Sequence, residues 1–167
     1  MDTKEQILYL RELQGLINRM PGVQNTPFEE NKSASKFDLI VTDSELSKVT
    51  KKLFLDGHHA RAVEEAFKYV NNYIKKHSGI TAADGSGLMK QVFSAKSPII
   101  KLNSGVSQSE QDEQLGYMEI YSGCMTGIRN PRAHEHEWED SETKALQLLG
   151  IANHLVEKVQ LALLDVD

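Results

Sequence analysis

The segment GIRNPRAHEHEWED, residues 127–140, gathers two arginines, two histidines and several carboxylates around one proline. Arg129 and His134 are the pair with the most specific chemistry. A histidine titrates near neutral pH and can take or give a proton, whereas an arginine is always charged and its forked donors match phosphate oxygens. Together they suit cleavage of RNA, in which a neighbouring 2′-hydroxyl attacks the phosphorus and a cation stabilises the developing charge.

Pro131 lies between these two residues. A proline has no backbone N–H and its ring crowds the preceding turn of a helix, and it disfavours the helical conformation of the residue before it. We therefore expect the helix to stop or bend at Asn130. On an uninterrupted helix Arg129 and His134 would lie ~140° apart, so a break between them would let both side chains turn into one cleft.

The same residues also allow other interpretations. Arg129 alone could cap the C-terminus of a helix, and His134 could be a hydrogen-bonded core group. His134 and His136 have a spacing adequate for two metal ligands, but zinc requires a third and usually a fourth. Because the chain has one cysteine and no HExxH motif, we predict neither a metal site nor a cofactor, and we expect the acidic residues after His134 to be solvated.

Apolar residues at helical spacing predict an all-α bundle of four to five long helices with an irregular middle segment. Residues 1–43 are expected to form an N-terminal helix, over 3–19, and a linker. Within this linker, residues 20–37 read as a loop and FDLIVTD (37–43) as a strand fragment or extended anchor. Residues 44–167 are expected to form the helical domain, which folds with the N-terminal helix as one unit.

Four long helices are expected in this domain, and one or two helical turns could form in GLMKQVFS (87–94). A capping box of Thr42 and Glu45 begins the first, which ends at Gly57. The second spans 58–77, the third runs from Ser107 to Arg129 and the fourth starts near Asp140 or Ser141. The predicted buried face of the first helix is Leu46, Val49 and Leu53, and that of the second is Val63, Ala66, Phe67, Val70 and Ile74, with Glu64 and Lys68 on its outer side. The predicted buried face of the third helix is Met118, Tyr121, Met125 and Ile128. That of the fourth is Ala145, Leu148, Leu149, Ala152, Leu155, Val156, Val159 and Leu163.

Three glycines interrupt the third helix on one side, at Gly116, Gly123 and Gly127. Each costs ~1 kcal/mol in a helix interior, so we expect another helix or a ligand to approach this side closely. Packing or surface positions are expected for the remaining distinctive side chains: His59 in the core or an interface, His154 at the surface, Cys124 buried and inert, and Met89, Met118, Met125, Tyr117 and Tyr121 in packing. His58 has no assigned role.

The overall composition fits a globular domain: 167 residues, 40% hydrophobic and 26% charged, with a net charge of −5. The chain has no run of 18 apolar residues, and the first residues, MDTKEQILYLREL, read as a helix and not as a secretory signal. We therefore expect a cytoplasmic protein without a membrane partner. An acidic chain binds nucleic acid only through a local basic site.

Arg129-Asn130-Pro131-Arg132-Ala133-His134-Glu135 resembles the signature of the HEPN superfamily, whose ribonucleases carry arginine, a polar residue, three variable positions and histidine. More narrowly, DGHHARAVEEAFKYVNNYIKK, DGSGLMKQVFS and SGCMTGIRNPRAHEH resemble the Ymh family of prokaryotic HEPN-like proteins. This likeness covers roughly residues 45–162, and its most specific part is the arginine-to-histidine string.

The resemblance implies a helical bundle that homodimerises, with two copies of the motif forming one composite cleft. Many such proteins are metal-independent endoribonucleases in toxin–antitoxin or phage-defence systems, including abortive infection, whereas others are inactive modules that bind a nucleotide or a protein. By the motif match Arg129 and His134 are the catalytic candidates and RNA the substrate, with Asn130, Arg132 and His136 auxiliary. An antitoxin or defence-system partner is implied. However, a partner-modified tyrosine often lies two residues after the histidine, where this chain has His136.

Overall fold

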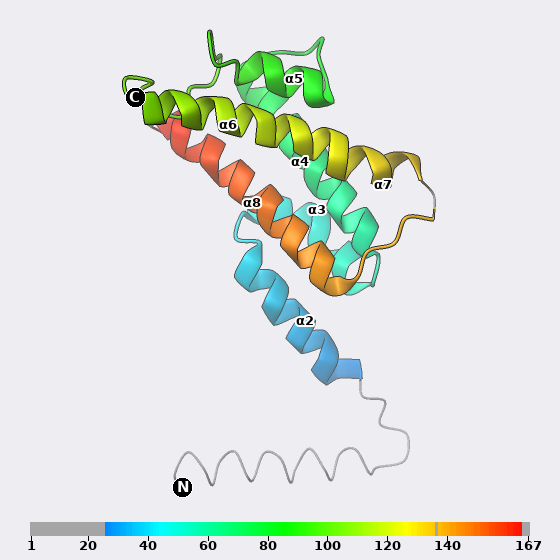
Figure 1. Ribbon diagram of the computed structural model, residues 1–167. Coiled ribbons are helices and arrows are strands. Elements are labelled where there is room, and N and C mark those ends of the chain that lie inside the picture. Colours follow the sequence, from blue (N-terminus) through cyan, green and yellow to red (C-terminus); the bar gives the residue numbers. More distant parts are fainter. Residues whose placement is uncertain (1–25, 136, 165–167) are drawn as a thin grey trace, which may run out of the picture. The chain divides into compact units, whose positions relative to one another are not determined.

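The computed structural model describes residues 26–135 and 137–164, which are helical with no strand among them, as predicted (Figure 1). The helix expected over residues 3–19 lies outside this part. The described helices are α2 (Thr26–Ile40), α3 (Ser44–Leu55), α4 (His59–Ser78), α5 (Gly85–Val92), α6 (Gln108–Cys124), a π-helical turn η1 (Met125–Arg129), α7 (Asn130–His134) and α8 (Glu142–Leu164). None of them is long and apolar enough to cross a membrane. The chain divides into two units between Ser35 and Lys36.

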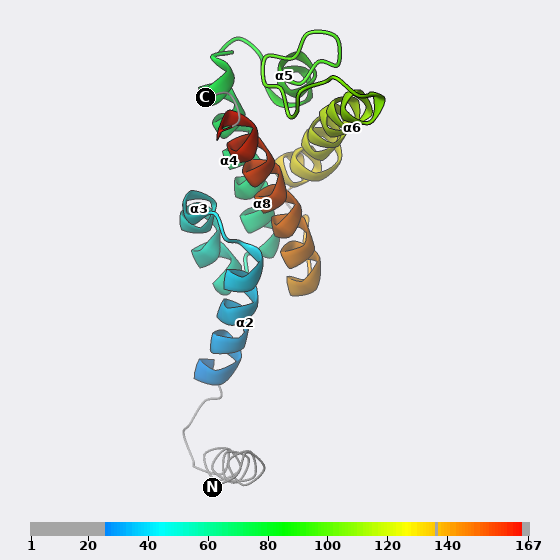
Figure 2. The same cartoon turned by 90° about the vertical axis from the view of Figure 1, so that its left-hand side faces the viewer.

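The core of the larger unit forms around α4 and α8, which lie side by side in both views, with α3 against α4 (Figures 1 and 2). All five residues of the predicted α4 stripe are buried. Of the eight residues predicted for the last helix, Leu148 and Leu163 are half-buried and the others are buried. Side chains of α6 contact α8, as in the bond from the Tyr121 hydroxyl to the Leu155 carbonyl; η1 packs against α4, and α5 packs against α6. Amphipathic periodicity thus predicted the buried faces of α4 and α8 correctly.

The segment before α3 differs from its prediction. Residues 26–37 are helical and not a loop, and Phe37–Ile40 form the last turn of α2 and not a strand or extended anchor. Pro27 falls in the first turn, where a helix does not need the missing N–H donor. The driving contact is Phe37, which is fully buried with its ring centroid 5.3 Å from that of Phe54. Tertiary burial therefore outweighs the weak helical signal of this polar stretch.

The start of α3 is one residue later than predicted, because Asp43 is the N-cap and its side chain accepts a hydrogen bond from the backbone N–H of Leu46 at 2.7 Å. The hydroxyl of Thr42 instead donates to Glu157 at 2.6 Å. The predicted inner residue Val49 is exposed, and Thr50 takes its place in the core by donating its hydroxyl to the carbonyl of Leu46 at 2.7 Å. The buried face of α3 is therefore rotated from its apolar pattern.

Glu64 was expected on the outer side of α4 but is buried, with Arg61 Nη1 at 2.6 Å and Lys68 Nζ at 2.8 Å from its carboxylate. Burial alone would raise the pKa of Glu64, but the hydrogen bonds and charges of Lys68 and Arg61 outweigh it and keep the pKa below its ordinary value. The two cations therefore allow a carboxylate to remain ionised at the edge of the core.

The irregular middle segment between α5 and α6 is held by one buried side chain. Gln114 accepts a hydrogen bond from the N–H of Leu102 at 2.8 Å, and its amide nitrogen donates to the carbonyls of Phe93 at 3.1 Å and Ile100 at 3.3 Å. The predicted capping box of Ser107 and Glu110 is present at the start of α6. Backbone groups that no regular element satisfies are thus paired by a glutamine.

Candidate functional site

The motif lies on one continuous helical run, α6–η1–α7, and not across a break. Asn130 keeps helical angles, φ −62° and ψ −43°, and its N–H donates to the carbonyl of Met125, five residues back. The predicted stop at Asn130 is therefore wrong. A π-helical turn is wider than an α-helical one, which leaves room for the ring of Pro131 where an α-helix would bring the carbonyl of residue 127. The chain leaves the helix only at Glu135, whose backbone is extended.

Arg129 is the last residue of η1 and points toward the start of α5. Its Nη1 atom lies 3.9 Å from the position that a Cβ on Gly85 would occupy. The side chain is half-buried, and its Nε atom is enclosed without a hydrogen-bond partner. Among the described residues no carboxylate pairs with it. An arginine in such a place without a counter-ion is unusual and leaves its charge free for an anionic ligand.

His134 is the last residue of α7 and is exposed. No other described residue forms a hydrogen bond or an ion pair with its ring. On a regular helix Arg129 and His134 would lie ~140° apart. The helix does not stop at Asn130, so the break from which we expected the two side chains to converge is not present.

The auxiliary candidates have different surroundings. Asn130 is half-buried, and no described residue bonds to its side chain. His136 lies outside the described residues. Arg132 is buried, with only 3% of its side chain exposed, and it binds the carboxylate of Asp140 through Nε at 2.6 Å and Nη2 at 2.9 Å. Its Nη1 donates to the carbonyl of Ile128 at 2.7 Å. Arg132 therefore binds groups of its own chain.

Asp140 was expected to be a helix cap or one of the solvated acidic residues after His134, but it is buried and is the centre of the contacts between α7 and α8. Its carboxylate is fully buried and also accepts bonds from Lys144 Nζ at 3.0 Å and Trp138 Nε1 at 3.4 Å. Burial alone would raise the pKa of Asp140, but the hydrogen bonds and charges of Arg132 and Lys144 outweigh it and lower the pKa below its ordinary value. The actual cap of α8 is Ser141, whose hydroxyl accepts the N–H of Lys144 at 3.3 Å.

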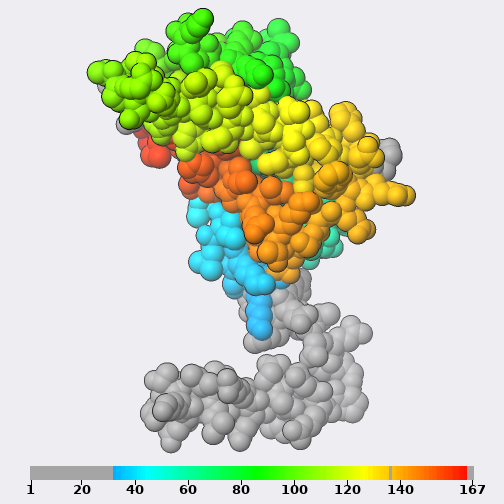
Figure 3. Space-filling view, viewed as in Figure 1, coloured from blue at the N-terminus to red at the C-terminus, as the bar shows by residue number. Residues whose placement is uncertain are grey.

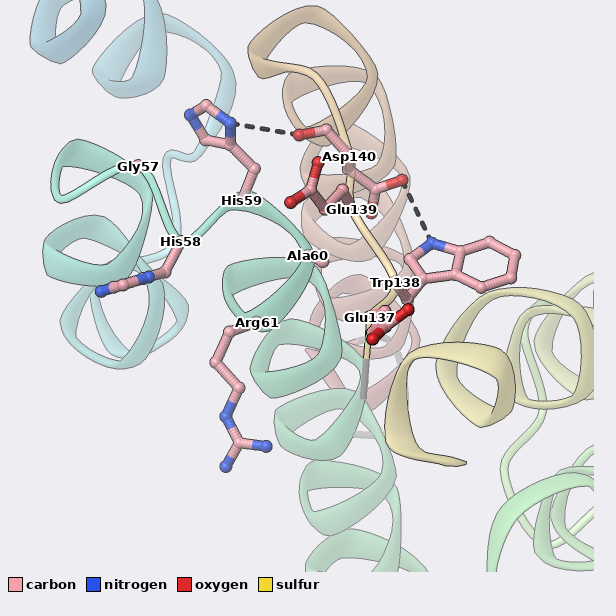
Figure 4. A pocket seen from close by; sticks show the side chains of 9 residues that line it. All are labelled: Gly57, His58, His59, Ala60, Arg61, Glu137, Trp138, Glu139 and Asp140. Atoms are coloured by element: carbon pink, nitrogen blue, oxygen red, sulfur yellow. Dashed lines mark hydrogen bonds between the residues drawn. The ribbon is translucent and has the colours of Figure 1, made fainter. Parts of the chain in front are cut away.

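A hollow of about 410 Å³ lies between the start of α4 and the segment 137–140 (Figure 4). His58, His59 and Arg61 line it from one side, and Glu137 and Glu139 from the other. The ring of His59 is half-buried, lies 5.1 Å from that of Phe54, and has its Nδ1 3.3 Å from the carbonyl oxygen of Asp140. The expected packing role of His59 is therefore confirmed, whereas His58 is exposed.

Trp138, between α7 and α8, is another residue that the sequence analysis did not single out. The guanidinium carbon of Arg132 lies 5.4 Å from the centroid of its ring, and Lys144 Nζ lies 5.5 Å from it. Both distances are within the range of cation–π attraction. The position of Trp138 between these two cations could not be predicted from sequence spacing, because Arg132, Trp138 and Lys144 lie in α7, a loop and α8.

The glycine-containing side of α6 is open. Gly116, Gly123 and Gly127 are exposed, and a Cβ at any of them would meet no atom of the described residues within 4 Å. Ile120, on the same side, is 47% exposed. The close neighbour that these glycines predict is therefore not part of the described chain. Figure 3 shows α6, η1 and α7 as one uninterrupted band on the molecular surface.

The other predicted packing residues support this helix. Tyr121 is buried, donates its hydroxyl to the carbonyl of Leu155 at 2.7 Å and stacks on Phe93 with the ring centroids 4.2 Å apart. Cys124 is buried as expected, and burial raises the pKa of its thiol to about 11, which makes it a poor nucleophile. His154 is exposed as predicted, with Nε2 2.6 Å from the hydroxyl of Tyr117.

Within residues 26–135 and 137–164, no three histidine, cysteine, aspartate or glutamate side chains converge as a metal site would require. A family model described as "Protein of unknown function (Hypoth_ymh)" matches residues 41–159, which is more than half of the chain. The chain belongs to the Hypoth_ymh family. The Hypoth_ymh match runs from the residues just before α3 into the second half of α8 and includes Arg129, His134 and the surroundings of Asp140. No curated protein and no solved structure matches the chain significantly.

Proposed function

We propose that this Hypoth_ymh protein is a metal-independent endoribonuclease of the HEPN type, acting in the cytoplasm as a toxin or an anti-phage effector. The observation that carries the proposal is the pair Arg129 and His134. The guanidinium has no counter-ion and the imidazole no partner among the described residues, although both belong to a motif that resembles the HEPN signature. Ionisable groups without structural partners at one joint are candidates for chemistry on a ligand.

The reaction follows from the chemistry of the two side chains. A neutral His134 removes the proton of a ribose 2′-hydroxyl, whose oxygen attacks the adjacent phosphorus. The bond to the 5′-oxygen breaks, and that oxygen takes up a proton, so that the products end in a 2′,3′-cyclic phosphate and a 5′-hydroxyl. Arg129 stabilises the charge on the phosphoryl oxygens in the transition state. Because RNA supplies the nucleophile, the reaction needs no metal.

The active species is a homodimer. In the superfamily that the motif resembles, two copies of the motif form one composite cleft, so Arg129 of one copy and His134 of a second copy would act together there. The surface available for this contact is the side of α6 and η1 that bears Gly116, Ile120, Gly123 and Gly127, which are spaced as neighbours along one helix face. Without side chains, glycines permit close approach of a second helix.

Single-stranded RNA is the substrate that this surface favours. The chain carries a net charge of −5, so its acidic exterior would repel extended duplexes and restrict binding to the short stretch that enters the cleft. A defence-system protein or an antitoxin would control the activity. Since His136 occupies the place of the tyrosine that some antitoxins modify, control by a bound partner is the simpler expectation.

The test is cleavage of a fluorophore-labelled, mixed-sequence single-stranded RNA by the wild type and by His134→Ala, Arg129→Ala and His136→Ala, each compared at equal fractions of folded protein. We expect loss of cleavage in the first two variants, by ~100-fold or more, and a milder loss in the third. Full activity of His134→Ala would end the ribonuclease proposal.

The alternative is a catalytically inactive HEPN-like module that binds a nucleotide or a protein. The half-buried guanidinium of Arg129, with its enclosed Nε, favours this function, because an arginine set back from the surface can hold an anion without catalysing a reaction. Retention of a labelled RNA or nucleotide without cleavage by the wild type, together with weaker retention by Arg129→Ala, would support it.

A further inference from the structure

The end of α7 and the segment that follows it are joined by an ion pair between Arg132 and Asp140. Both side chains of this pair are buried, at 3% and 0% exposure, and the guanidinium binds the two carboxylate oxygens in parallel, at 2.6 Å and 2.9 Å. A forked pair of this kind fixes the angle between its partners as well as their distance. The pair is hereafter called the clasp.

The clasp is joined to the helices around it. The carbonyl of Ile128, in η1, accepts a bond from Arg132, and Lys144, in α8, donates to Asp140. The backbone carbonyl oxygen of Asp140 lies 3.3 Å from the ring of His59, at the start of α4, and Figure 4 shows this contact beside the bond from Trp138. Elements from distant parts of the sequence are therefore joined through Arg132 and Asp140.

The segment held by the clasp carries His134. The helix α7, Asn130–His134, is the last turn of the continuous run α6–η1–α7, and the ends of helices fray. The ring of His134 is exposed and without a partner in the described chain. The direction of this side chain therefore depends on the backbone of α7, which the clasp fixes at Arg132, two residues before it.

We propose that Asp140 is a positioning residue for His134 and acts through Arg132, so that the second arginine of the motif serves the protein and not the RNA. What His134 does once positioned rests on the function proposed above. All three nitrogens of the Arg132 guanidinium are engaged by Asp140 and Ile128. A buried ion pair is often a weak source of stability but a strong source of a defined geometry.

The first experiment is hydrogen exchange of the full-length protein, which needs no substrate. Asp140→Asn keeps the shape of the side chain but loses the charge, and Arg132→Lys keeps the charge but loses the fork. The control is Lys158→Ala, which removes a partly buried ion pair to Glu113 elsewhere in the fold. We expect exchange in peptides covering residues 131–140 to accelerate about tenfold in Asp140→Asn, less in Arg132→Lys and not in the control.

The second experiment measures RNA cleavage by the same proteins. A misplaced general base lowers the rate of the chemical step, so we expect kcat of Asp140→Asn to fall by about 100-fold and KM to stay within about threefold. Arg132→Lys should retain part of kcat, because it keeps the positive charge. A merely structural loss would instead reduce the amount of folded protein and leave kcat per folded molecule unchanged.

A further variant keeps the test decisive if Asp140→Asn does not fold. The double substitution Arg132→Met, Asp140→Leu replaces the pair by apolar groups of similar size, which is often neutral for stability. This variant should fold and yet show the fast exchange and the low kcat. Control-like exchange and kcat in a folded clasp variant would overturn the proposal. If the wild type cleaves no RNA, the proposed function fails, and exchange of residues 131–140 alone decides whether the clasp orders this segment.

Discussion

Replacing Arg129 by methionine should make the protein more stable while it abolishes RNA cleavage. Methionine keeps an unbranched apolar stem and removes the guanidinium. That group has no ion pair in the described chain, and its Nε is enclosed without a partner. A buried polar group that lacks a hydrogen bond costs ~1–3 kcal/mol, so we expect the free energy of unfolding to rise by ~1–2 kcal/mol.

Arg132→Met provides the matched comparison, three residues further along the same helix. Its guanidinium is fully engaged, and its loss leaves the buried carboxylate of Asp140 with Lys144, whose side chain is 50% exposed. Breaking a buried pair costs ~3–5 kcal/mol. Because Lys144 still compensates part of the charge, we expect a loss of ~2–4 kcal/mol.

The assay is thermal unfolding followed by circular dichroism, combined with RNA cleavage. For a domain of this size 1 kcal/mol corresponds to ~2–4 °C in Tm. Arg129→Met should therefore gain ~2–8 °C and lose ~100- to 1000-fold in cleavage rate, whereas Arg132→Met should lose ~4–16 °C. A Tm of Arg129→Met well below that of the wild type would refute the reasoning, because it would show that the guanidinium has a partner that stabilises the fold.

Three further predictions concern pH, assembly and metal. Because the folded-state pKa of Asp140 is lowered, its contribution to stability is present above its unfolded pKa and is lost as pH falls through the folded value. The difference in unfolding free energy between wild type and Asp140→Asn should therefore be constant from pH 5 to 7 and shrink below about pH 4; urea titrations at several pH values would measure it, and a constant difference down to pH 2 would contradict it. Gly123→Leu, at an exposed position with no atom within 4 Å, should leave the monomer folded but weaken the dimer in sedimentation experiments, and an unchanged dimer would place the interface elsewhere. RNA cleavage should persist in EDTA and leave 2′,3′-cyclic phosphate ends detectable by mass spectrometry, whereas activity that returns only with zinc or magnesium would favour a metal enzyme.

Local signals in the sequence predicted the elements that obey helical periodicity. The stripe of α4 and the capping box of Ser107 and Glu110 are where the pattern places them, because each depends on neighbours within a turn or two. The same logic failed for α3, where Thr50 and not Val49 is buried. A threonine can be buried when its hydroxyl donates a hydrogen bond to a carbonyl of the preceding helical turn. A pattern of polar and apolar residues does not show whether this bond forms.

The sequence offered residues for the candidate site but not their geometry. Arg129 and His134 were proposed from their types, their spacing and the resemblance of the motif, and Pro131 was expected to disturb a regular α-helix. In the structure a π-helical turn before Asn130 accommodates the proline, and the helix does not break after Asn130. The pairing of Arg132 with Asp140 was not predictable, because it connects a helix to the far end of a loop whose path no periodicity determines.

The π-helical turn also has a consequence for how this protein can vary in length. A π turn holds one residue more than the α-helical path between the same two points, so η1 acts as a one-residue insertion placed directly before the motif. Losing one residue of η1, for example Gly127, would restore an α-helical path between the same two points, so the residues on either side would keep their relative direction. The ring of Pro131 would then meet the carbonyl four residues before it, which the wider turn now avoids. The extra residue of η1 thus accommodates the proline without changing the direction of the motif.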